Sequence, residues 1–143
     1  MLTTEKRGVW ELEEEISREL LKYEKYFWER SKAEELCELI ANRIERRASR
    51  QITLRGWKRD IGWSFYSPRN FASAAWRKVK QSLVIDTSKK WAEQARVSDF
   101  ADATTEKGWH GEPSCIWYVQ AGDVEKRERV AHYLAKVCIA RHR

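Results

Sequence analysis

The spacing of apolar residues near the start of this 143-residue chain is the feature that most limits its fold. Between Val9 and Phe27 large apolar side chains recur every three or four positions, the period of one face of an α-helix. The members of this stripe are Val9, Leu12, Ile16, Leu20, Tyr23 and Phe27. Trp10, Leu21 and Trp28 are expected to widen it. The spacing therefore predicts an amphipathic helix from Val9 to Arg30.

A second helix is predicted from Lys32 to Ser49. Ser31 followed by Glu34 matches a capping box, which indicates a break and a new start. Ala33, Leu36, Cys37, Ile40 and Ile44 form the apolar face of this second segment. Because the join is short, the two helices are expected to pack as an antiparallel hairpin, with one long kinked helix as the alternative.

The middle of the chain changes to an alternating pattern. Gln51 to Trp57 and Ile61 to Tyr66 are predicted as the strands of a hairpin, because apolar and polar residues alternate in both. Ser67 and Pro68 match a helix start, so a helix is predicted from Pro68 to Leu83. Leu83 to Ile85 is either the end of that helix or a short strand.

The last third is predicted as a helix, a loop, a strand and a helix. The ranges are Ser88 to Ala103, Thr104 to Ser114 and Cys115 to Gln120, followed by a helix capped by Asp123. The resulting order, ααββααβα, predicts an α+β fold: an N-terminal helical hairpin and a small, mostly antiparallel sheet covered by helices. With 42% apolar residues, the whole chain, 1–143, is expected to form a single compact domain.

The net charge and the cysteine content indicate the class of partner and the cellular compartment. A formal net charge of +6 favours an anionic partner. The three cysteines, Cys37, Cys115 and Cys138, lie far apart and are expected to be free thiols in a reducing cytoplasm. No apolar run approaches the roughly 20 residues of a membrane span, and the first ten residues lack a secretory signal. The chain is thus expected to be cytoplasmic, without membrane contact.

Aromatic and basic residues are concentrated in one segment, from Arg55 to Lys80. It holds six large aromatic residues and seven bases against one acid. Rings that stack on bases, set among cations that contact phosphates, are typical of a nucleic-acid surface. The predicted binding residues are Arg47, Arg50, Arg55, Trp57, Lys58, Arg59, Tyr66, Arg69, Arg77 and Lys80. Trp63 and Phe65 share a strand face with Ile61, which points to the core.

Catalytic and metal-binding patterns are weak. His110 and Glu112, in a loop bounded by glycines, are the candidate proton-transfer pair, as general base and acid. The cysteines and histidines lack zinc-site spacing, and the common nucleotide, protease and hydrolase motifs do not occur. No metal site and no cofactor are therefore expected, and a binding protein is favoured over an enzyme.

Three functions remain open at this point. The first is a small basic protein that binds RNA or DNA, with single strands favoured over duplex because unstacked bases can stack on its rings. The second is a small, toxin-like, metal-independent ribonuclease that uses His110 and Glu112. The third is a protein-binding or inhibitor module, with a homodimer or a protein partner held through the N-terminal helices.

Overall fold

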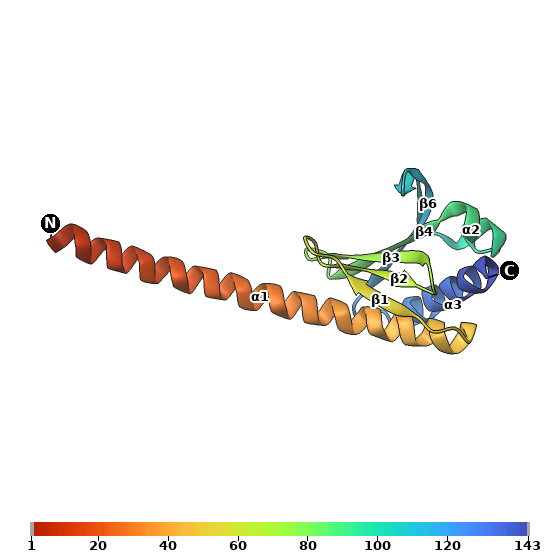
Figure 1. Ribbon diagram of the computed structural model, residues 1–143, viewed down its shortest axis with the longest axis horizontal. Coiled ribbons are helices and arrows are strands. Elements are labelled where there is room, and N and C mark those ends of the chain that lie inside the picture. Colours follow the sequence, from red (N-terminus) through yellow and green to blue (C-terminus); the bar gives the residue numbers. More distant parts are fainter. Residues whose placement is uncertain (1, 143) are drawn as a thin grey trace. The chain divides into compact units, whose positions relative to one another are not determined.

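A computed structural model of the chain describes the backbone of residues 2–142 and the side chains of residues 12–142. Packing divides the chain into two compact units, residues 1–32 and residues 33–143. Within the described residues the structure has three α-helices, a short 3-10 helix and a six-stranded antiparallel sheet (Figure 1). The predicted α+β class is confirmed, although several elements differ from the prediction. The side chains of the predicted stripe residue Val9 and of Trp10 lie outside the described residues.

The first helix, α1, is continuous over Leu2–Ala48. The predicted break at Ser31 and the predicted helical hairpin are therefore wrong. No glycine or proline lies between Val9 and Ala48, so every residue of this stretch can continue the helical hydrogen-bond ladder. A serine inside a helix costs about 0.5 kcal/mol relative to alanine, whereas each new helix end leaves four backbone groups without an intrahelical partner. The helix ends where Ser49 adopts a left-handed φ of 53°.

Six strands follow in the spatial order β1-β2-β3-β4-β6-β5. Their bounds are β1 Thr53–Gly56, β2 Gly62–Tyr66, β3 Asn70–Arg77, β4 Ser82–Ser88, β5 Ala103–Trp109 and β6 Glu112–Gln120. The predicted hairpin of β1 and β2 is confirmed, with Leu54 opposite Phe65. The strand at Leu83 to Ile85 also exists, as part of β4.

The predicted helix from Pro68 to Leu83 is wrong, because this stretch forms β3 and the start of β4. Alanine at positions 72, 74 and 75 makes the segment apolar at both helical and alternating spacing, so periodicity alone does not separate the two. In the structure Ala72, Ala74 and Trp76 point to the core, while the residues between them do not. Backbone hydrogen bonds to β2 on one side and to β4 on the other stabilise the strand conformation of this segment.

The remaining elements are α2 Lys89–Gln94, the 3-10 turn Ser98–Phe100, and α3 Val124–Arg141. The predicted helix from Ser88 to Ala103 is thus much shorter than expected, and the predicted loop from Thr104 to Ser114 contains β5 and a tight turn. The strand from Cys115 to Gln120 is confirmed as part of β6. Asp123 caps α3 as predicted, since its Oδ1 accepts a hydrogen bond from the backbone N of Lys126 at 3.0 Å.

The core of residues 33–142 lies between one face of the sheet and a layer of helices formed by residues 33–48 of α1, by α2 and by α3 (Figure 1). The sheet contributes Trp63, Phe65, Trp76, Leu83, Ile85, Cys115, Trp117 and Val119 to it, and the helices contribute Leu36, Cys37, Ile40, Ile44, Val130, Leu134, Val137 and Cys138. The expectation that Trp63 and Phe65 face inward is confirmed. All three cysteines are free and buried. Burial of one sheet face leaves the opposite face available for a site.

Candidate nucleic-acid interface

The second face of the sheet presents a row of polar side chains across four strands. Arg55 lies opposite Ser64, Ser64 opposite Ser73, and Ser73 opposite Asp86 in the strand register. Because successive side chains of a strand point to opposite faces, these four residues share the face that turns away from Trp63, Phe65 and Ile85. Their side chains are half-buried or exposed. This surface, centred on the row from Arg55 to Asp86, is called the open face below.

Trp57 lies flat against one end of the open face, just beyond β1. Its indole Nε1 donates a hydrogen bond to Ser64 Oγ at 3.0 Å. A Cβ atom at Gly62 would lie 2.7 Å from Trp57 Cδ2, a distance that real Cβ contacts do not show. The absence of a side chain at Gly62 is therefore what lets the indole approach the sheet. Trp57 as a whole residue is half-buried.

Two tyrosines add ring surface to the open face. The guanidinium of Arg55 lies over the ring of Tyr66, with Cζ 4.6 Å from the ring centroid. This cation–π contact holds a charged group and a ring together, in a geometry that can also take a base. Tyr118 of β6 lies opposite Val84 of β4 and is 46% exposed. The rings of Trp57, Tyr66 and Tyr118 thus border the polar row.

Basic side chains gather at one end of the sheet. The β1–β2 and β3–β4 connections lie at the same end, because Gly62, where β2 begins, pairs with Ala75 near the end of β3. Their bases are Lys58 and Arg59 in the first connection, with Arg77, Lys78 and Lys80 in or beside the second. All five are exposed, and Asp60 is the only acid in these two connections. This end of the open face is therefore strongly positive.

A hollow of about 290 Å³ opens on the open face next to these bases. Arg77, Lys80, Ser82, Val84, Tyr118 and Gln120 line it. Five of them come from three neighbouring strands, since Ser82 pairs with both Arg77 and Gln120, and Lys80 lies in the connection between β3 and β4. A ring at Tyr118, two cations and several hydrogen-bonding groups surround one shallow space, which suits a nucleotide better than an apolar ligand.

Asp86 is the acidic group of the open face. Burial raises the pKa of its carboxyl group, while the hydrogen bond that Ser73 Oγ donates to Asp86 and the nearby His110 act in the opposite direction. The hydrogen bond from Ser73 and the nearby His110 thus offset only part of the free-energy cost of removing the charged carboxyl group from water. A carboxylate at this position accepts hydrogen bonds, and it disfavours phosphates directly above it.

Four of the ten predicted binding residues border the open face, namely Arg55, Trp57, Tyr66 and Arg77. Lys58, Arg59 and Lys80 lie in the connections at its positive end. Of the six aromatic residues in the middle segment, only Trp57 and Tyr66 lie on this face, because Trp63, Phe65, Phe71 and Trp76 are buried in the core. The helix expected to carry Arg69, Arg77 and Lys80 is a strand and two connections.

Three predicted residues lie elsewhere. Arg47 belongs to the helical layer, where its guanidinium lies 3.9 Å from Glu128 and donates to His132 Nδ1 at 3.3 Å. Burial, with smaller effects of Lys136 and Arg47, lowers the pKa of His132. Arg50, just after α1, lies at the opposite end of the sheet from the basic connections. Arg69, between β2 and β3, lies at that same opposite end. The structure does not bring these three arginines to the open face.

His110 and Gly111 form a two-residue hairpin turn between β5 and β6, and Glu112 is the first residue of β6. His110 and Gly111 have φ of 48° and 84°, as a type I′ turn requires, and Trp109 pairs with Glu112. Among residues 12–142 no hydrogen bond or ion pair joins His110 to Glu112, and the imidazole instead packs edge-on against Trp109 with centroids 4.9 Å apart. The carboxyl group that His110 influences is that of Asp86.

Sequence reasoning missed Tyr118, Ser64, Ser73 and Asp86 as members of the surface. The sequence does contain a signal for Tyr118. Cys115, Trp117 and Val119 alternate as core residues, so Tyr118 between them is expected to point outward. The serines and Asp86 carry no signal of their own. Their alignment depends on the register of three strand pairs, one of which lies in a segment that resembles a helix.

The described residues hold no cluster of three or more histidine, cysteine, aspartate or glutamate side chains placed for a metal ion. No described helix combines the length and apolar character needed to cross a bilayer. No protein-family model, no curated protein and no solved structure matches this chain.

Proposed function

We propose that the chain binds single-stranded nucleic acid on the open face of its sheet. The observation that supports this most is the division of the aromatic residues. Trp63, Trp76 and Trp117 fill the core, whereas Trp57, Tyr66 and Tyr118 border the opposite face together with exposed cations. Rings on the uncovered face of an antiparallel sheet form a stacking surface that accepts any base.

The spacing of the rings favours an extended strand over a duplex. Tyr66 and Tyr118 lie on β2 and β6, three strand steps apart, and they are also four residues apart in register, because Tyr118 aligns through Val84 and Ala75 with Gly62. At about 4.8 Å per step and about 3.3 Å per residue, the two positions are about 20 Å apart. Bases between these rings would lie over Ser64, Ser73 and Asp86, whose side chains offer hydrogen-bond donors and acceptors. Paired bases inside a duplex expose no face for such stacking.

The cations define where the phosphates would run. Lys58, Arg59, Arg77 and Lys80 surround the positive end of the open face, while Asp86 at its middle repels phosphate. The backbone of a bound strand is therefore expected to follow the basic end, with its bases directed toward the polar row. The three buried free thiols suit a reducing compartment, and we extend the proposal to a cytoplasmic location on that ground.

The test is fluorescence anisotropy with labelled single-stranded and double-stranded oligonucleotides of equal length, over a salt series. Tighter binding of the single strand, with an affinity that falls steeply with salt, is the expected result. Equal affinity for both forms would refute the stacking argument, and no binding at low salt would refute the function as a whole.

A ribonuclease is the second candidate, favoured by one observation. Asp86 has a raised pKa and lies close enough to His110 for the imidazole to affect its titration, and general acid–base catalysis needs such a pair. On this account Asp86 takes the place first assigned to Glu112. Cleavage of RNA that is lost in both His110→Ala and Asp86→Asn would support the activity, and intact RNA after prolonged incubation at micromolar protein would exclude it.

A further inference from the structure

The first unit of the chain exposes a continuous apolar stripe. Within residues 12–32 of α1 it consists of Leu12, Ile16, Leu20, Tyr23 and Phe27, each between 47% and 60% exposed. These five side chains are called the α1 stripe below. Tyr23 and Phe27 pack edge-on with ring centroids 4.6 Å apart, so the rings already form a small cluster on the helix. Apolar surface of this extent on a helix is typical of a face that another element covers.

The α1 stripe runs nearly parallel to the helix axis. Its spacings of four, four, three and four residues place all five side chains within about 80° of arc at 3.6 residues per turn. Val9, three residues before Leu12, begins an 11-residue repeat that returns at Leu20. Such a repeat drifts by only about 20° per period, which keeps a long stripe facing one neighbour.

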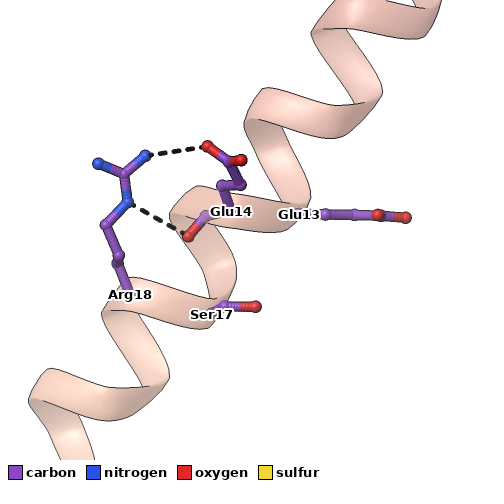
Figure 2. Close-up of a pocket in the computed structure, with 4 residues that line it drawn as sticks. All are labelled: Glu13, Glu14, Ser17 and Arg18. Atoms are coloured by element: carbon purple, nitrogen blue, oxygen red, sulfur yellow. Dashed lines mark hydrogen bonds and ion pairs between the residues drawn. The ribbon is translucent and has the colours of Figure 1, made fainter.

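The other residues of α1 lie on faces that differ from the α1 stripe. Leu21 and Trp28 are exposed too, but they lie about 120° around the helix from the α1 stripe and do not widen it as the sequence suggested. Figure 2 shows the opposite, polar side, where Arg18 reaches back to Glu14 through an ion pair of 3.7 Å and a hydrogen bond of 3.4 Å to its carbonyl oxygen. Glu13 and Ser17, also labelled in Figure 2, point away from this pair, to another side of the same helix.

Charge along the helix is divided between its two halves. Residues 9–20 contain five glutamates and one arginine, whereas residues 21–32 contain two glutamates and four bases. The first half therefore carries −4 and the second half +2. A second copy that runs in the opposite direction sets each acidic half against a basic half, whereas a parallel copy sets −4 against −4.

The spacing of the stripe residues also fits a second copy that runs in the opposite direction. In an antiparallel pair centred between Glu19 and Leu20, Leu12 faces Phe27 of the second copy and Ile16 faces Tyr23. Four of the five stripe positions thus meet another stripe position, and Leu20 lies next to the twofold axis. A symmetric interface requires such self-complementarity.

From these observations we infer that two copies of this chain associate through their α1 stripes as an antiparallel pair of helices. The occupant of the stripe is a second copy of the chain, and its recognition combines apolar contact along residues 12–27 with the opposite charges of the two halves. This association does not depend on nucleic acid.

The first test measures the mass of nuclease-treated full-length protein by analytical ultracentrifugation over a range of concentrations. The expected mass rises from 17.0 kDa toward twice that value as concentration increases. Leu20→Ser should raise the dissociation constant at least tenfold. The matched control is Leu21→Ser, which removes an equally exposed leucine outside the stripe and should leave the dissociation constant unchanged. A monomer at every concentration up to roughly 1 mM, or equal effects of both variants, would overturn the inference.

The second test fixes the orientation by charge reversal. Glu13→Lys, Glu15→Lys and Glu19→Lys together change the acidic half from −4 to +2, so both halves become positive and an antiparallel dimer should weaken. Adding Lys22→Glu, Lys25→Glu and Arg30→Glu changes the other half from +2 to −4 and should restore the dimer. A parallel pair behaves oppositely, because the first three substitutions relieve its repulsion. Stronger dimerisation of the triple variant would therefore contradict the antiparallel arrangement.

Discussion

Replacement of three cations of the open face gives the most quantitative test of the proposed function. The variant combines Lys58→Gln, Arg77→Gln and Lys80→Gln, three cations at the positive end where the phosphates are expected to run. Each cation that contacts a phosphate releases counterions, so log Kobs changes with log salt by about −0.7 per contact on a single strand. If all three contact phosphates, the slope should become shallower by about 2. Over a fourfold change in salt the variant should then lose about 20-fold less affinity than the original protein does.

The matched control removes the same charge from the helical layer. Arg46→Gln, Lys90→Gln and Lys136→Gln replace three exposed bases of α1, α2 and α3. Both variants and the original protein would be titrated with one labelled single-stranded oligonucleotide by anisotropy at four or more salt concentrations. A control slope close to that of the original protein is expected. Equal slope changes in the two variants would mean that net charge alone drives binding, and unchanged slopes in both would refute the placement of the phosphates.

The remaining predictions concern binding, local packing and stability. Trp57→Ala should weaken single-strand binding by about 1–3 kcal/mol if a base stacks on the indole, as the same anisotropy titration would show; an unchanged Kd would remove this ring from the site. Gly62→Ala should displace the indole from the sheet and shift its fluorescence, because the new methyl group occupies the place of the ring. An unaltered spectrum would contradict that packing. Asp86→Asn should stabilise the protein at neutral pH, because the raised pKa of Asp86 means that stability falls as pH rises from the unfolded-state pKa through the folded one. Urea unfolding of both proteins from pH 4 to pH 8 should show this gain shrinking toward low pH, and a gain independent of pH would argue against the shift. Ile40→Ala should cost about 2–5 kcal/mol of unfolding free energy, because Ile40 is fully buried in the core, and a loss below about 1 kcal/mol would contradict that burial.

The sequence predicted best those elements whose signal is local. α3 carries a capping aspartate at Asp123 and a helical stripe, and the strand at Cys115 to Gln120 is a strongly apolar run. The first hairpin alternates clearly between core and surface, so Trp63 and Phe65 were assigned correctly. In each of these cases propensity, periodicity and burial agree within about ten residues.

The errors arose where local and tertiary signals disagree. The Ser31 capping pattern was weaker than the uninterrupted helix-forming residues around it, and the stretch after Pro68 became a strand because its alanines fit between Phe65 and Ile85 on neighbouring strands. For the site, the sequence located the cationic and aromatic segment but not its geometry. Asp86 and Tyr118 joined the open face only through strand pairing over long sequence separations, which no local pattern records.

The central claim concerns the open face itself, and the indole N–H signals of the tryptophans test it most directly. Eight tryptophans give a small set of resonances in a ¹H–¹⁵N spectrum, and single substitutions assign those of Trp57, Trp63 and Trp117. On addition of a single-stranded oligonucleotide, the signal of Trp57 is predicted to shift, while those of the buried Trp63 and Trp117 stay in place. Binding that leaves the Trp57 signal unchanged would place the nucleic acid elsewhere and contradict the account.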